Sequence, residues 1–293
     1  MSEDPYADRR SLTFAQAEGA EPLPQQLQLR VISTEMRALL WRATHDSLLR
    51  SKTSDTVFAP LSITGRWEKV LRDFWSSRLH RLEDFDTEFY SAKKLVREIF
   101  ENGDYVRVFD FLQFVLRHPS CPSDFDRVID LALCQTRAAY RVLGNDTIVP
   151  IGSEDEAEAL QRAFVDLAEA EFHGARSHLR DAGSHLTAGE YAASVRESIS
   201  SVESVARKLG SLQTLAGALQ RLERTSRIHP SLKNGFTSIY GYTSDEKGIR
   251  HSLLDDAQAE VDEADALFMM GACAAFVSYL INKARLSGCL ADR

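Results

Sequence analysis

The sequence has few cysteines and no arrangement of them that binds a metal. Cys121, Cys134, Cys273 and Cys289 form no C-x-x-C pair and have no histidine at a zinc-ligand spacing. The chain also lacks a glycine-rich phosphate loop, an H-E-x-x-H segment and a nucleophile elbow. These absences exclude the sequence signatures of zinc proteins, P-loop hydrolases and α/β-hydrolases, and we expect neither a cofactor nor a metal.

The chain has no net positive charge, and long apolar runs are scarce. The formal net charge of −8 excludes a global attraction to nucleic acid. The apolar run Ala264–Ile281 is at the short edge of the roughly 18–20 residues that span a bilayer, and acidic residues precede it. We interpret it as a buried central helix and expect no membrane contact. No signal peptide is recognisable, so the expected location is the cytoplasm.

The composition is that of a folded protein, and the apolar spacing predicts helices nearly throughout. With 44% hydrophobic and 27% charged residues, the chain can bury a core. We predict an all-α fold with one small β-hairpin. The predicted parts are a loosely ordered N-terminus (1–28), an N-terminal helical module ending in the hairpin (29–152) and a helical bundle (153–293).

The expected helices follow from apolar periodicity, capping residues and helix-ending Gly and Pro. In the module they cover Thr34–Leu49, Gly65–Leu79, Asp86–Glu101, Asp104–Arg117 and Ser123–Tyr140. In the bundle they cover Glu154–Asp181 (one helix or a pair), Thr187–Gly210 behind a capping box, Leu212–Leu222, a shorter helix from Pro230, and Asp262–Ala284. The hairpin is predicted at Tyr140–Ile151, because two β-rich arms flank Gly144-Asn145-Asp146.

The stretch Ile239–Leu253 is the main functional candidate, and we call it the Arg–His motif. It contains Tyr240, Tyr242, an acid pair, Lys247 and the adjacent Arg250 and His251. A histidine beside two cations indicates contact with an anion such as a phosphate. The alternative is a polar connection between helices whose Arg250 and His251 make ordinary ion pairs.

The spacing inside the motif predicts a helical face. Thr243-Ser-Asp-Glu246 has the capping-box pattern, so a helical turn is expected to begin at Ser244. Lys247 and His251 would then lie one turn apart with Arg250 beside them, and Asp255 could orient the imidazole. Gly248 lowers helix stability and indicates a close backbone approach or a kink.

A basic run leads into the motif and an acidic run follows it. Residues 207–250 contain eight Lys or Arg against three acids, and residues 255–265 contain six acids. The two runs either pair, within the fold or across a dimer, or leave a cationic groove for a phosphate backbone. We favour pairing.

An Arg–His pair suits metal-independent cleavage of RNA. The histidine can take or give a proton at the 2′-hydroxyl or the leaving oxygen, while the guanidinium stabilises the phosphorane. A single histidine provides only one group for proton transfer, and a symmetric dimer would bring a second histidine to the site. The other histidines are scattered, and Glu197 and Glu203 are interpreted as structural.

Several segments resemble the type 4 AbiJ N-terminal domain family. They are Leu27–Leu29 with Leu39–Trp41, Tyr140–Ile151, Ser194–Ser204, Ile228–Pro230, Tyr240–His251 and Asp265–Leu280. The resemblance covers most of residues 12–285 and is strongest across 190–282. It implies abortive-infection (anti-phage) defence and a C-terminal bundle related to HEPN domains, which are often dimeric ribonucleases.

The resemblance also implies site residues. Arg250 and His251 are the implied catalytic residues, and Asp245 and Gly248 match the family's motif. Lys247 is a third catalytic candidate from the helix-face argument and not from the resemblance. Asp255, Tyr240 and Tyr242 complete the expected binding residues. The chain departs from the usual HEPN pattern, which places an Arg four to six residues before the His: here residues 245–247 are Asp, Glu and Lys.

The sequence therefore supports two alternative hypotheses about function. The first is a metal-independent HEPN-type ribonuclease, an enzyme acting on RNA as a homodimer. The second is a non-catalytic RNA- or nucleotide-binding or assembly module of a defence or toxin–antitoxin system. The expected partners are RNA, a second copy of the chain, and a phage or antitoxin protein, with Tyr240 or Tyr242 as a modification site in the toxin case.

Overall fold

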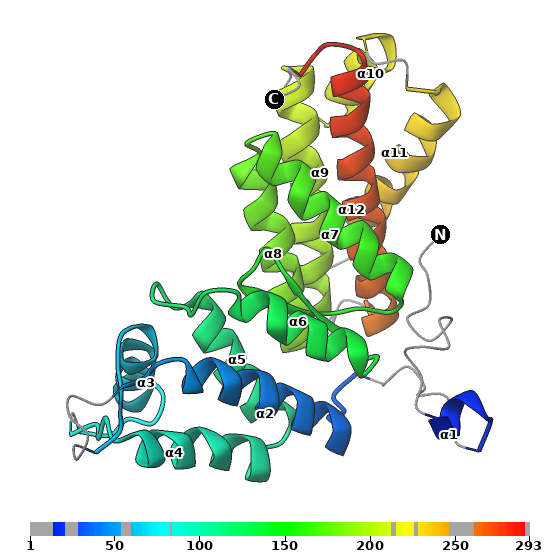
Figure 1. Cartoon of the computed structure of the whole chain (residues 1–293). Helices are drawn as coiled ribbons and strands as arrows, with labels where there is room; N and C mark the ends of the chain where they lie inside the picture. The colour runs from blue at the N-terminus through cyan, green and yellow to red at the C-terminus, as the bar shows by residue number, and fades with distance from the viewer. Residues whose placement is uncertain are drawn as a thin grey trace, which may run out of the picture. The chain divides into compact units, whose positions relative to one another are not determined.

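The computed structural model describes residues 14–20, 29–53, 60–82, 84–211, 215–225, 228–245 and 261–290. It is mostly helical, with two small antiparallel strand pairs, which confirms the predicted fold class. The chain divides into two compact units, Met1–Ile148 and Val149–Arg293, which we call the N-terminal and C-terminal units. Figure 1 shows their elements.

The N-terminal unit contains a short helix, five longer helices and three of the four strands of the described chain. These are α1 (Phe14–Ala17), α2 (Thr34–Leu49), β1 (Lys52–Thr53), β2 (Ser62–Ile63), α3 (Arg66–Ser77), α4 (Phe89–Asn102), α5 (Tyr105–Arg117), α6 (Phe125–Gln135) and β3 (Tyr140–Leu143). The predicted helix over Thr34–Leu49 has the same bounds as α2. Asp104 caps α5 by accepting a hydrogen bond from the Arg107 N–H at 2.9 Å, as the polar residue before an apolar run predicts.

Aromatic side chains from successive helices form the core of this unit. Trp67 lies edge-on to Phe125 at 5.5 Å, and Phe111 contacts both Phe74 and Phe100 edge-on. All but Phe74 are at most 2% exposed, and Phe74 is 5% exposed. Such contacts are worth about 0.5–1.5 kcal/mol each beyond the buried area. The helices are therefore held by tertiary packing of one apolar face each.

The predicted hairpin is present as β3 paired with β4 (Thr147–Pro150). Gly144 and Asn145 between them have φ of 61° and 70°, the left-handed conformation that a tight two-residue turn requires. The pair β1–β2, with Lys52 opposite Ile63, was not predicted. Strands of two residues are too short to show an alternating pattern.

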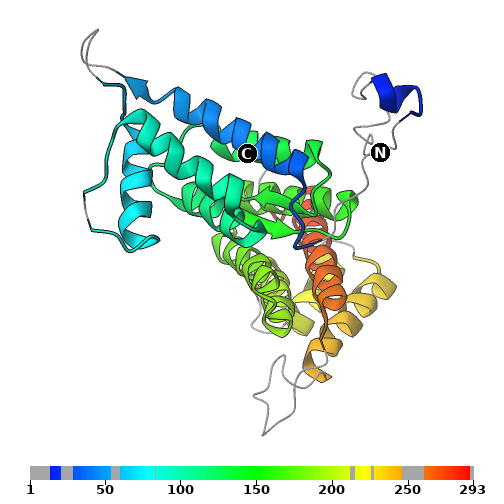
Figure 2. The ribbon, with the colours of Figure 1, turned by 90° about the horizontal axis from the view of Figure 1, so that it is seen from below.

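The C-terminal unit is a helical bundle. Its helices are α7 (Glu154–Glu169), α8 (His173–Ala188), α9 (Tyr191–Gly210), α10 (Leu215–Thr225), α11 (Pro230–Asp245) and α12 (Glu263–Leu286). Figures 1 and 2 both show α9 and α12 side by side, and α9 also contacts α8 and α10. The prediction left open whether Glu154–Asp181 is one helix or two; the structure has two.

The predicted capping box at Thr187 is wrong. Thr187 lies inside α8, where its hydroxyl donates to the Gly183 carbonyl at 2.9 Å. Gly189 ends α8 with a φ of 77°, and α9 starts at Tyr191 without a side-chain cap. Thr187 therefore bonds back along its own helix, and glycine supplies the left-handed residue that stops α8. The predicted end of α9 at Gly210 is confirmed.

Helix α12 is the apolar helix of the bundle. It is long and apolar enough to cross a membrane by length and composition, with a mean hydropathy of 1.7 in its most apolar window. Of that window, 61% is buried inside the protein, and Ala274, Val277 and Ile281 are fully buried. A core helix of this kind meets the same length and composition criteria as a membrane span.

Candidate functional site

The Arg–His motif begins in α11, and most of it lies outside the described residues. Tyr240 is described with its side chain, whereas Tyr242 and Asp245 are placed on α11 by their backbone alone. Lys247, Gly248, Arg250, His251 and Asp255 lie outside the residues that the structure describes. The predicted grouping of Lys247, Arg250 and His251 on one helical face therefore stays a prediction.

The predicted start of a helical turn at Ser244 is wrong. Helix α11 begins at Pro230 and continues through Asp245, so Thr243 and Ser244 lie inside it. Proline is favoured in the first turn of a helix, so Pro230 suits the start of α11. No further proline occurs up to Asp245 to break the helix. The Thr-x-x-Glu pattern marks a helix start only where the preceding backbone is not already helical.

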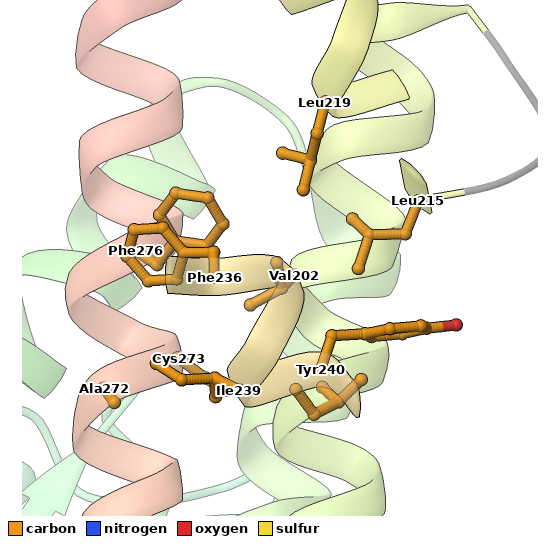
Figure 3. Close-up of a pocket in the computed structure, with 10 residues that line it drawn as sticks. Val202, Leu215, Leu219, Phe236, Ile239, Tyr240, Ala272, Cys273 and Phe276 are labelled. Carbon is orange, nitrogen blue, oxygen red and sulfur yellow. The ribbon is translucent and has the colours of Figure 1, made fainter. Parts of the chain in front are cut away.

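An apolar pocket lies beneath α11, and Tyr240 is one of its lining residues. Figure 3 shows the side chains that enclose it. They come from α9 (Ile199, Val202), α10 (Leu215, Leu219), α11 (Phe236, Ile239, Tyr240) and α12 (Ala272, Cys273, Phe276). The enclosed volume is only about 10 Å³, room for a single water. A ligand can enter this pocket only if α11 moves.

Helix α11 buries little side-chain surface among its described residues. Phe236 stacks on Phe276 of α12, and Lys233 forms an ion pair of 2.6 Å with Glu223 of α10. Its described side chains from Pro230 to Gly241 are all half-buried or exposed, whereas α9 has nine buried residues. Elements with little buried apolar surface open at the lowest cost. The helix that carries the start of the motif is thus the bundle element best suited to local opening.

The reactivity of the Cys273 thiol can be used to measure the opening of α11. The thiol lies in the pocket wall and is 3% exposed, and burial raises its pKa to about 12. The thiolate is the reactive form. In the closed protein Cys273 is unreactive for two reasons: reagents cannot reach it, and its raised pKa keeps it protonated. Exposure to water would lower the pKa of Cys273 toward its ordinary value and make the thiol reactive.

The variant Phe236→Ala is expected to increase the labelling rate of Cys273 by a thiol reagent at pH 8. Loss of the stack on Phe276 weakens the anchoring of α11, and about 1.4 kcal/mol of lost anchoring corresponds to a tenfold faster rate. Peptide mass spectrometry separates Cys273 from the exposed Cys289. Phe268→Ala is the matched control, because Phe268 lies on α12 but is 60% exposed. Equal Cys273 rates in the two variants would contradict the inferred opening.

The basic run before the motif is partly paired within the bundle. Arg207 lies 2.9 Å from Glu203, and Lys233 lies 2.6 Å from Glu223. Lys208 donates to the Glu171 carbonyl and lies over the Phe172 ring. The partners of these three cations belong to the C-terminal unit: Glu203 and Glu223 lie on α9 and α10, and Glu171 and Phe172 lie between α7 and α8. The acidic residues 255–260 lie outside the described part. Pairing within the fold is thus observed for these three.

The histidines outside the motif have structural partners or are exposed. His118 bonds to Asp73 at 2.8 Å, His178 to Glu197 at 2.7 Å and His185 to Glu190 at 2.5 Å. Burial and then the positive charge of Lys93 lower the pKa of His45. Glu203 pairs with Arg207 in the same way. Glu197 and Glu203 therefore each have a partner, as expected of structural carboxylates.

Ser194–Ser204, one of the segments that carried the resemblance, belongs to the bundle core. Ser194, Ser198 and Ser201 are fully buried on α9, and the Ser198 hydroxyl donates to the Ser194 carbonyl at 2.8 Å. The Ser194 and Ser201 hydroxyls have no hydrogen-bond partner within the described chain. Small side chains let neighbouring helices approach closely, so this segment is explained by packing.

The described structure is that of a helical protein with two compact units. Within its described residues, no group of three or more His, Cys, Asp and Glu side chains could hold a metal ion. The family model for AbiJ N-terminal domain 4 matches residues 12–166, more than half of the chain. The chain belongs to this family, and the AbiJ family indicates a role in abortive-infection defence.

The match also corrects where the resemblance lies. It ends at Asp166, so residues 190–282, where the resemblance was expected to be strongest, are outside it. No curated protein and no solved structure matches the chain. The family assignment therefore depends on the N-terminal unit and α7.

Proposed function

We propose that the protein is an abortive-infection defence protein that cleaves RNA without a metal ion, with a HEPN-like C-terminal unit as the nuclease. The observation that carries the defence role is the family match over residues 12–166. The nuclease activity is a finer proposal that rests on Lys247, Arg250 and His251 in the sequence. A cytoplasmic homodimer would bring two motifs, and so two histidines, to one RNA.

The chemistry requires a proton carrier and a fixed positive charge. The pKa of an ordinary histidine lets the imidazole of His251 exchange a proton near neutral pH. The Arg250 guanidinium stays charged and can donate two parallel hydrogen bonds to phosphate oxygens. Lys247 adds a second charge. The loosely anchored α11 supports the proposal, because it can present the motif without unfolding the α9–α12 pair.

The experiment is incubation of the purified chain with total RNA or transfer RNA in the presence of EDTA. The wild-type protein is expected to cleave RNA, because no step needs a metal, and His251→Ala is expected to lose at least about 100-fold of the rate. His229→Ala is the matched control: His229 is exposed at the start of α11, where its Nδ1 accepts a hydrogen bond from the Ser231 N–H.

Two outcomes would refute the nuclease. Equal cleavage by the wild type and His251→Ala would assign the activity to other residues or to a contaminant. RNA binding without cleavage would favour the non-catalytic binding module, with Arg250 as an anchor. Arg207 and Lys233 pair with Glu203 and Glu223, so the cations proposed to contact RNA are Lys247 and Arg250 of the motif in either case.

A further inference from the structure

A second pocket, in the N-terminal unit, is roomy enough for a small molecule. It has a volume of about 370 Å³, which lies within the roughly 300–1,000 Å³ of ligand sites. It is formed by Trp75 near the end of α3, by Arg81 and residues 84–86, and by one face of α4. Its volume is far larger than the 10 Å³ beneath α11. We call it the Trp75 pocket.

Hydrogen bonds hold the walls of the Trp75 pocket in place. The Trp75 indole N–H donates to the Leu82 carbonyl at 2.7 Å, and the Arg81 N–H donates to the Trp75 carbonyl at 3.2 Å. Phe85, 8% exposed, lies edge-on to Trp75 at 5.8 Å. Arg81, Leu82 and Phe85 therefore surround the indole and form one wall of the pocket.

The Asp86 end of this wall is also fixed. The Asp86 carboxylate accepts a hydrogen bond from the Glu88 N–H at 2.9 Å. This bond, and then the bond to Ser91, lower the pKa of Asp86. The Phe89 N–H donates to the Leu61 carbonyl at 2.7 Å and ties the start of α4 to the segment before β2. Asp86 is thus a charged, positioned part of the rim.

The pocket carries charges that the fold does not use. The side chains of Asp84, Lys94 and Glu98 make no hydrogen bond or ion pair with any other described residue, although all three line the pocket. The Arg81 guanidinium lies 4.5 Å from the centre of the Trp75 ring. A cation on an indole face leaves its outer face open for another planar group.

These groups define the chemistry of a ligand. A hydrocarbon would leave the charges unmatched, and a simple anion would meet the carboxylates of Asp84, Asp86 and Glu98. A simple cation would leave Arg81 and Lys94 without a partner. The fitting molecule is planar, carries N–H donors for carboxylates and an anionic group for Lys94. A nucleotide has all three.

We propose that the Trp75 pocket binds a guanine nucleotide. Ionised carboxylates only accept hydrogen bonds, and guanine presents two adjacent N–H donors on one edge, where adenine presents an acceptor beside its amino group. The base stacks on the Arg81 guanidinium, its edge faces Glu98 or Asp84, and its phosphate faces Lys94. The proposal does not depend on RNA cleavage, because it concerns residues 75–98 and a binding measurement.

The test is isothermal titration of the purified full chain with GMP, AMP, UMP and inorganic phosphate. GMP is expected to bind at one site per chain, at least tenfold more tightly than AMP or UMP, and phosphate alone is expected not to bind. Lys94→Met and Glu98→Gln are each expected to weaken GMP binding at least tenfold. Far-ultraviolet circular dichroism shows that each variant is folded.

Two neighbouring residues on α4 supply matched controls. Glu101→Gln removes a carboxylate that pairs with Arg97 at 2.7 Å, and Lys93→Met removes the lysine whose charge acts on His45. Neither residue lines the pocket, and GMP affinity in both variants is expected to stay within twofold of the wild type. Absence of GMP binding, equal affinity for GMP and AMP, or equal affinity in Lys94→Met and Lys93→Met would overturn the proposal.

Discussion

Replacing Trp67 by alanine is expected to lower the free energy of unfolding of the N-terminal unit by about 3–5 kcal/mol. The indole is 2% exposed, lies edge-on to Phe125 at 5.5 Å and is one of the largest fully buried side chains. Its removal leaves a cavity among helices that are held by such contacts. Urea denaturation measures the change, and only the transition of the N-terminal unit should move.

A milder pair of variants separates packing from hydrogen bonding at the same site. The Trp67 indole N–H donates to the Ser47 hydroxyl at 3.0 Å, and Ser47 is 3% exposed. Trp67→Phe removes that donor and keeps most of the ring, and Ser47→Ala removes the acceptor. Each is expected to cost about 1–3 kcal/mol, less than Trp67→Ala. A cost for Trp67→Ala no larger than for Trp67→Phe would show that the core does not depend on the ring.

The second large effect is expected for Arg285→Met in the C-terminal unit. Arg285 on α12 pairs with Asp166 of α7 at 2.8 Å and with Glu169 at 3.1 Å, and Asp166 is 6% exposed. Without Arg285, the Asn282 amide at 3.3 Å is the one remaining side-chain partner of the buried Asp166 carboxylate among the described residues. An unpaired buried charge costs about 3–5 kcal/mol, and the 21% exposure of Arg285 favours the lower end, about 3 kcal/mol.

Two further variants distinguish the cause. In the double variant Asp166→Asn with Arg285→Met no charge is left buried, so most of the stability should return. The exposed pair Arg162–Glu158 has a similar distance, 2.7 Å, with side chains 61% and 54% exposed. Arg162→Met is therefore expected to cost less than about 1 kcal/mol. Equal costs for Arg285→Met and Arg162→Met in chemical denaturation would contradict the buried-charge explanation.

Apolar spacing predicted the helices well because each buries one face. Helix α2 has the predicted bounds Thr34–Leu49, and Gly144-Asn145 marked the hairpin because both residues adopt positive φ. Capping patterns were less reliable. Thr187 and Thr243 both lie inside helices, because the chain before them is already helical. A local pattern does not show how the preceding residues are arranged.

The candidate sites were predictable only in part. Tyr240 was selected from the sequence, but its place in an apolar pocket depends on Phe276 and Cys273 of α12, which are distant in the chain. Trp75 follows the apolar spacing of a core-facing helix stripe, and in the structure it is half-buried beside an open pocket. Lys94 and Glu98 lie one helical turn apart on α4, and no motif in the sequence marks them. Only the arrangement of Arg81 and residues 84–86 against α4 gives them a common pocket.

The most direct test of the defence role is a phage plating assay on cells that express the chain. Wild-type protein is expected to reduce plaque number relative to cells with an empty vector, and His251→Ala, expressed at the same level, is expected to lose this protection. The control His229→Ala should protect like the wild type. Equal plaque numbers on wild-type and empty-vector cells across a panel of phages would contradict the defence role, and full protection by His251→Ala would contradict catalysis by the Arg–His motif.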